Sequence, residues 1–185
     1  MIIKTERLTL RPFKLSDLDS THAYAGDPTN TEYMLHLPNR SKDGSERFLR
    51  WAIEEWKNDE QRVYEFAIIL SGEHIGAVSM GLKDDKKTGE IGWIICRDYQ
   101  GKGFATEAAK AIMDYAFDWL EVEKVVAHCD YRNAASVRIM EKIGMILERD
   151  DLMRRYKNSD EDMQELMYSI RKPTYLQWPT SLADS

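Results

Sequence analysis

The residues best suited to chemistry form a glycine-rich turn at 100–105, which reads Gln-Gly-Lys-Gly-Phe-Ala. An apolar segment at 91–96 precedes this turn, and a segment with helical periodicity follows it. Unpaired N–H groups and the positive end of the helix dipole meet where a helix begins. Glycines leave that backbone uncovered, so the turn predicts a site for an anion, usually a phosphate. A flexible turn between two core elements is the structural alternative.

Two phosphate-binding patterns do not fit this turn. The Walker pattern needs Gly, four residues and then Gly-Lys-Ser/Thr, and the turn lacks it. The dinucleotide pattern needs a third glycine at position 106, which is Thr106, and a strand that leads directly into the first glycine, whereas residues 97–100 intervene here. Asp130, at the end of a later predicted strand, is the one residue that favours a nucleotide-dependent oxidoreductase, which therefore stays a minor alternative.

A second polar segment reads Asn-Ala-Ala-Ser at 133–136 and is followed by Glu-Lys-Ile-Gly-Met at 141–145. The two segments together resemble the GNAT N-acetyltransferases, with their Gln/Arg-x-x-Gly-x-Gly/Ala pyrophosphate loop and their later Asn-x-x-Ser…Glu-Lys-x-Gly-Phe helix. Residues 5–12, Thr-Glu-Arg-Leu-Thr-Leu-Arg-Pro, resemble the start of the ribosomal-protein (Rim-type) branch of that family. The resemblance spans roughly residues 4–170.

The resemblance implies that acetyl-CoA is the co-substrate. In the family, the backbone amides of the glycine-rich loop hold the pyrophosphate, and Lys102 would add positive charge here. The exposed edge of the strand before the loop pairs with the pantetheine chain. The residues implied to bind acetyl-CoA are Trp93, Ile94, Ile95, Gly101, Lys102, Gly103, Phe104, Ala105, Thr106, Asn133 and Ser136.

The implied reaction needs a proton acceptor for the amine and a hydrogen-bond donor for the leaving thiolate. Glu90 is the favoured base, directly or through a water, ahead of His74 and His128. The structural alternative for Glu90 is an exposed carboxylate at a strand end. Many relatives have a Tyr seven residues after the Asn as the proposed general acid, but Met140 stands there and has no proton to give. The Rim-type branch offers Ser136 instead, with ordinary helix capping as its alternative role.

The acceptor pocket is expected to involve the polar loop at 27–42, with Tyr33 and His36 as its predicted lining residues. The Rim-type resemblance favours a protein N-terminal α-amine, attacked directly without an acyl-enzyme. A small-molecule amine, such as a polyamine or an aminoglycoside, is the alternative acceptor. A non-catalytic CoA-binding protein with the same fold is the alternative function.

Periodicity and turn residues predict the elements that position these residues. Strands are expected at 2–13, 63–70, 74–82, 89–96, 124–129, 145–157 and 161–170. The fold class is therefore α/β, with a mixed, mostly antiparallel sheet of about seven strands and about four helices. The resemblance implies a central splay between two parallel strands, 89–96 and 124–129. The helix after the glycine-rich turn is expected to bury one stripe, formed by Phe104, Ala108, Ile112, Tyr115 and Trp119.

The 185 residues are expected to form one domain, 1–170, followed by a tail at 171–185. The net charge of −6 argues against a general nucleic-acid binder. No apolar run reaches the roughly 18 residues of a membrane helix, and the N-terminus lacks a signal-peptide core. Cys96 and Cys129 suggest reduced thiols in the cytoplasm. No metal-ligand spacing is present, and a homodimer is left open.

Overall fold

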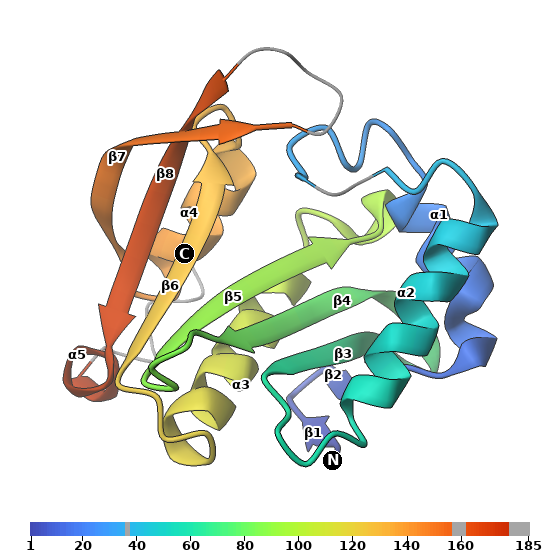
Figure 1. The fold of residues 1–185 in the computed structure, drawn as a ribbon, viewed down its shortest axis with the longest axis horizontal. Helices are drawn as coiled ribbons and strands as arrows, with labels where there is room; N and C mark the ends of the chain where they lie inside the picture. The colour runs from blue at the N-terminus through green and yellow to red at the C-terminus, as the bar shows by residue number, and fades with distance from the viewer. Residues whose placement is uncertain (36–37, 157–161, 178–185) are drawn as a thin grey trace.

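The computed structural model describes residues 1–35, 38–156 and 162–177, whose strands form one open sheet (Figure 1). The eight strands are β1 (Ile3–Lys4), β2 (Leu8–Pro12), β3 (Val63–Leu70), β4 (Glu73–Leu82), β5 (Thr88–Ile95), β6 (Lys124–Asp130), β7 (Ile146–Arg155) and β8 (Asp162–Arg171). They lie side by side in the order β1-β2-β3-β4-β5-β6-β8-β7.

Helices lie on both faces of this sheet. They are α1 (Leu18–Ala25), α2 (Lys42–Glu55), α3 (Phe104–Asp118), α4 (Ala134–Lys142) and α5 (Lys172–Gln177), with the 3-10 turns η1 (Leu15–Asp17) and η2 (Arg97–Tyr99). In the view of Figure 1, α1 and α2 lie in front of β3 and β4, while α3 and α4 lie behind the sheet. None of these helices is both long enough and apolar enough to cross a membrane.

The central pair of strands, β5 and β6, is the one parallel pair among these strands. Its pairing is limited to residues 88–90 of β5 and 124–126 of β6. Beyond these residues β5 continues along β4 and β6 continues along β8, so the two strands diverge (Figure 1). The predicted fold class and the predicted central splay are therefore confirmed.

The helix α3 buries most of its predicted stripe against the sheet. Phe104, Ala108, Ile112 and Tyr115 all belong to the main hydrophobic core. The prediction for Trp119 is wrong, because its side chain is 75% exposed. The helix ends at the preceding residue, so Trp119 no longer follows the helical stripe.

The structure has eight strands and five helices where about seven and four were expected. The predicted strand at 2–13 is two short strands, because the Thr5 amide donates to the Leu8 carbonyl (3.0 Å) and β1 folds back on β2. The predicted tail begins with α5, which docks through Tyr175. Its hydroxyl donates to Asp114 (2.7 Å) and its ring packs against Phe117. Residue 178, a further predicted docking residue, lies outside the described residues.

Asp130 is a wholly buried carboxylate at the end of β6. Arg132 donates to both of its oxygens, from Nε (2.9 Å) and Nη2 (2.8 Å), and the Tyr156 hydroxyl donates to Oδ2. Burial alone would raise the pKa of Asp130, but these hydrogen bonds hold it at about 2. The carboxylate therefore ties the end of β6 to the end of β7.

Replacing Asp130 by Asn should lower the free energy of unfolding by about 2 kcal/mol, because the buried group loses charge-assisted hydrogen bonds. The folded-state pKa lies below the unfolded value, so the ionised carboxylate stabilises the fold at neutral pH. That contribution is lost as the pH falls from about 4 to about 2. Urea unfolding should therefore depend less on pH in this range in the Asn variant than in the parent.

The control for this prediction is Asp151→Asn, which breaks an exposed ion pair with Arg149 on β7. Exposed pairs contribute little, so this variant should unfold close to the parent. An equal loss of stability in the two variants would contradict the role given to Asp130.

Candidate active site

A cleft opens where β5 and β6 diverge, between the 29–34 segment, the glycine-rich turn and α4. Its lining includes most of the residues that the sequence predicted for the site. These are Tyr33, Trp93, Ile94, Ile95, Gly101, Gly103, Phe104, Ala105, Thr106, Asn133 and Ser136. His36, the other predicted pocket residue, lies outside the described residues.

The glycine-rich turn leads into α3 through two residues with positive φ. Gly101 has a φ of 74° and Gly103, the N-cap residue of α3, has a φ of 82°. Residues with a Cβ rarely adopt this conformation, which explains the glycine at both positions. The first intrahelical bond runs from the Glu107 amide to the Gly103 carbonyl (3.0 Å) and no side chain caps the helix. The preceding amides of the first turn are therefore available to an anion.

Gln100 fixes this turn relative to its neighbours. Its amide nitrogen donates to the Ile95 carbonyl at the end of β5 (3.1 Å) and to the Asn30 side chain (2.6 Å). The Gln100 side chain thus links the end of β5, the turn and the segment that carries Tyr33. This linkage gives a structural reason for the glutamine that opens the motif.

Lys102 was predicted to bring positive charge to the cofactor, and its ammonium does not point into the cleft. It donates to the Asp98 carbonyl (2.8 Å) and lies 5.3 Å from the centroid of the Tyr99 ring. Other cations of the described chain line the cleft instead, and these are Arg97, Arg138 and Lys142. Sequence reasoning missed them, although the spacing of four residues between Arg138 and Lys142 puts both on one side of α4.

Arg7 clamps the turn from outside. Its guanidinium donates to the Lys102 carbonyl (3.1 Å) and to Glu107 (2.6 Å), and it lies 4.7 Å from the centroid of the Phe104 ring. The Thr5 hydroxyl also donates to Glu107. Burial opposes ionisation of Glu107, but these hydrogen bonds hold its pKa below the ordinary value. The Thr-Glu-Arg opening of the sequence therefore supports the turn and the start of α3.

The edge of β5 supplies the predicted surface for an extended ligand. The Cys96 amide donates to the Ile75 carbonyl on β4 (2.8 Å). Backbone direction alternates along a strand, so Trp93 and Ile95 direct their N–H and C=O groups away from β4. The Ile95 carbonyl is bonded to the Gln100 side chain, which leaves the Trp93 groups and the Ile95 N–H toward the gap. Ile94 faces β4 with its backbone and contributes to the cleft with other atoms.

The first turn of α4 brings Asn133 and Ser136 to the cleft. Asn133 is the N-cap, since its side-chain oxygen accepts from the Ser136 amide (3.0 Å). Within the described ranges the Ser136 hydroxyl has no hydrogen-bond partner, so it does not cap the helix. Met140 is fully buried in the main core and has no access to the cleft.

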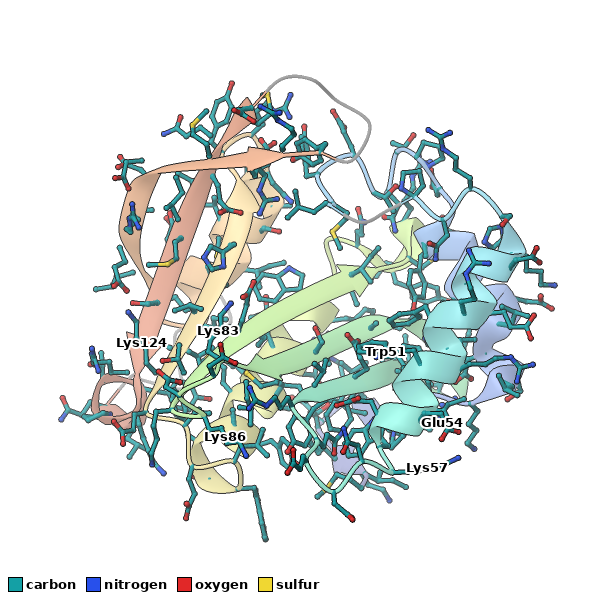
Figure 2. The ribbon with its side chains drawn as sticks, viewed as in Figure 1. Trp51, Glu54, Lys57, Lys83, Lys86 and Lys124 are labelled. Atoms are coloured by element: carbon teal, nitrogen blue, oxygen red, sulfur yellow. The ribbon has the colours of Figure 1, made fainter. Side chains whose placement is uncertain are left out.

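Glu90 lies at the narrow end of the splay, in the last pair between β5 and β6. One of its oxygens lies 3.2 Å from Nδ1 of His128, and the other forms an ion pair with Lys83. These hydrogen bonds outweigh burial and lower the pKa of Glu90 to about 2. A carboxylate held this firmly in its ionised form is a weak proton acceptor by itself. Figure 2 shows Lys83 on the side where β5 and β6 lie together.

The wall of the cleft near Tyr33 is attached to the last strands. Nη1 of Arg154 donates to the Tyr33 carbonyl (3.4 Å), and the Arg132 guanidinium lies 5.4 Å from the centroid of the Tyr33 ring. Arg154 is itself buried and paired with Glu165 of β8. The 29–34 segment is therefore held in place by residues more than 90 positions away in the chain.

Residues 7–146 match a family model described as an acetyltransferase (GNAT) domain. The chain belongs to the GNAT acetyltransferase family. It is an N-acetyltransferase with the GNAT fold, and acetyl-CoA is its co-substrate. The resemblance inferred from the two polar segments is confirmed at the level of the family.

Similar proteins include acetyltransferases with different acceptors in their names. The chain is 32% identical to the uncharacterized N-acetyltransferase YnaD of Bacillus subtilis, over 78% of this chain and 82% of that protein. It is 29% identical to spermidine N(1)-acetyltransferase of Escherichia coli, over 75% and 73% of the two chains. The structure of RimL, a ribosomal alpha-N-protein acetyltransferase in complex with coenzyme A, superposes with a TM-score of 0.82 at 20% identity, covering 92% and 98%.

These similarities establish the family and the fold, and they do not single out the Rim-type branch. At 20% identity the likeness to RimL is a likeness of fold. The relative named for spermidine is closer in sequence than RimL. The acceptor of this enzyme is therefore a separate question from its family.

Replacing Arg7 by Ala should raise the KM for acetyl-CoA about tenfold with little change in kcat, because the turn loses a charged hydrogen bond. Initial rates at varied acetyl-CoA concentration would measure both constants. The matched control is Arg50→Ala, which removes an exposed arginine paired with Glu46 on α2. A similar KM in the two variants would show that the turn holds its shape without Arg7.

Proposed function

We propose that this enzyme acetylates a protein N-terminal α-amine by direct attack of the amine on acetyl-CoA. The observation that carries the proposal is the cleft at the splay, with a free strand edge along one wall and uncapped helix amides at one end. The amides following Gly101 suit the pyrophosphate. The free edge at Trp93, with the N–H of Ile95, suits the amides of pantetheine, which can pair like a short extra strand.

The cations that line the cleft fit a cofactor whose pyrophosphate lies at the glycine-rich turn. Arg138 and Lys142 of α4 line the cleft together with Arg97. Coenzyme A carries several phosphate charges, and guanidinium groups bind phosphate through paired hydrogen bonds. We therefore assign the phosphate end of acetyl-CoA to the side of the cleft formed by η2, the turn and α4.

Ser136 is the proposed hydrogen-bond donor to the departing thiolate. Its hydroxyl is free of other partners in the described chain, lines the cleft and is not needed to cap α4. Asn133 caps the helix through its oxygen, which leaves its amide nitrogen for the pantetheine. Tyr33 is the proposed contact to the acceptor.

Two acceptor classes remain, and a specific observation favours each. The Thr-Glu-Arg opening, which resembles the start of the Rim-type branch, supports a protein N-terminus. The relative named for spermidine supports a polyamine. Either acceptor is an amine that reaches the enzyme as a cation. A cytoplasmic location fits both acceptors and the two free cysteines.

The deciding experiment is thiol release from acetyl-CoA against a panel of amines. The panel would contain peptides with free Ser, Ala or Met N-termini, the same peptides blocked, a lysine-containing peptide, spermidine and an aminoglycoside. Turnover restricted to free N-termini would support the proposal. Turnover restricted to spermidine or the aminoglycoside would replace the protein acceptor with a small amine.

Replacing Ser136 by Ala should lower kcat at least tenfold, because the leaving sulfur loses a donor in the transition state. The affinity for acetyl-CoA, measured as a shift in melting temperature, should change little. Ser79→Ala, on β4 and outside the cleft lining, is the control. An unchanged kcat in the Ser136 variant would assign protonation of the thiolate to solvent or to another group.

A further inference from the structure

We propose that His128, held in place by Glu90, is the base that takes the proton from the acceptor amine. The inference rests on the proposed function, because it assigns a step of the same transfer. It concerns the narrow end of the splay, where three side chains form a chain of contacts. Glu90 is in the middle, with His128 on one side and Lys83 on the other.

The two strands bring Glu90 and His128 to the same face of the sheet. Ala127 and Cys129 of β6 point into the main core with α3, so His128 between them points to the opposite face. On β5, Ile91 points into the same core and Glu90 therefore shares the face of His128. This open face is the side of the sheet on which α1 and α2 lie (Figure 1).

His128 stands at the point where the gap begins. The last pair between the strands joins Glu90 to Val126, and His128 is two residues further along β6. Beyond this point the edge of β5 is free for the pantetheine chain. This position on β6 lies at the start of the gap, whereas Trp93 and Ile95 lie further along β5.

The contacts of Glu90 suit a positioning residue better than a base. Both of its oxygens have cationic or N–H partners, and these partners lower the pKa of the carboxylate to about 2. At neutral pH such a group almost never carries a proton. Its oxygen instead accepts the N–H of the His128 ring at Nδ1, at 3.2 Å.

This contact fixes the tautomer of His128. With the proton on Nδ1, the other ring nitrogen, Nε2, has a free lone pair. Within residues 1–35, 38–156 and 162–177, Nε2 has no hydrogen-bond partner, and the side chain is 19% exposed. The ring is therefore held at Nδ1 by a carboxylate, while Nε2 has no partner in the described chain. An imidazole in this arrangement is a suitable general base, because the free lone pair of Nε2 can accept a proton.

The proton balance of the step is complete. The acceptor arrives as an ammonium ion, and Nε2 of His128 takes one proton from it. The neutral amine attacks the thioester carbonyl, so the C–N bond forms and the C–S bond breaks. The second proton of the amine passes to the sulfur, with Ser136 as hydrogen-bond donor to it. The products are the amide, free coenzyme A and one proton on His128, which is released to solvent.

Several other charges near this face are paired among themselves. Opposite His128 on the neighbouring strand β8 is the uncharged Met167. Many charged side chains of β6, β7 and β8 form ion pairs, among them Lys124–Glu148, Asp130–Arg132, Arg149–Asp151 and Arg154–Glu165. Arg171 of β8 lies on the same face, opposite Lys124 and four positions along β8 from Met167. Glu90, with Lys83 behind it, is therefore the charge that acts most directly on the imidazole.

The first test is the pH dependence of kcat/KM for thiol release, measured with the amine that the parent enzyme acetylates fastest. The parent should lose activity at low pH, as His128 becomes protonated. His128→Gln should lower kcat/KM at least a hundredfold near neutral pH. In this variant the loss of activity at low pH that depends on His128 should be absent. Added imidazole should partly restore activity to His128→Ala. His22→Gln, which changes a histidine on α1 bonded to Ser45, is the control and should match the parent.

The variant Glu90→Gln distinguishes the base, His128, from the residue that positions it. Removing the carboxylate takes away the contact that positions the ring, so Glu90→Gln should lower kcat/KM near neutral pH. The loss of activity at low pH should persist in this variant because the base is still present. Should this loss vanish in Glu90→Gln and persist in His128→Gln, Glu90 would be the base and the proposal would be overturned.

A second measurement does not depend on turnover. Nitrogen NMR of the ring-labelled parent, bound to coenzyme A, should show the proton of neutral His128 on Nδ1. Glu90→Gln should weaken this preference. A proton found on Nε2 in the parent would overturn the proposal even if the enzyme is active. Absence of thiol release with every amine of the panel would instead count against the proposed acceptors, while the tautomer would still decide the role of His128.

Discussion

The structure depends on one constraint, the short pairing of two parallel strands. β5 and β6 share three residues of pairing and then follow different neighbours. Backbone N–H and C=O groups left without partners are costly unless water or a ligand satisfies them. An extended chain of amides can satisfy them as a strand would. The open edge of β5 is thus an interruption of the sheet and the feature that suits it to the proposed cofactor site.

The two ends of the gap carry different chemical groups. Uncapped helix amides and the cations Arg97, Arg138 and Lys142 gather at the wide end. A carboxylate and a histidine stand at the narrow end. A cofactor that is anionic at one end and carries a neutral thioester at the other fits this arrangement, and so does an acceptor that arrives as a cation.

The sequence predicted features whose cause is local. Two glycines with positive φ, a helix N-cap at Asn133 and an amphipathic α3 all follow from residues close together in the chain. Contacts between distant segments could not be read in this way. The direction of Lys102 depends on η2, and the clamp by Arg7 joins residues 100 positions apart. The pairing of Glu90 with His128 depends on the register of β5 and β6, which no local pattern encodes.

The burial of Met140 bears on which residue can donate a hydrogen bond to the leaving sulfur. Asn133, Ser136 and Met140 follow one stripe of α4, since they are spaced by three and four residues. The first two line the cleft, whereas Met140 is fully buried in the core. A hydroxyl at position 140 would enter apolar surroundings and lose hydrogen bonds to water. The free hydroxyl nearest the cleft on this stripe is that of Ser136, so a donor to the sulfur belongs to the first turn of the helix rather than to the second.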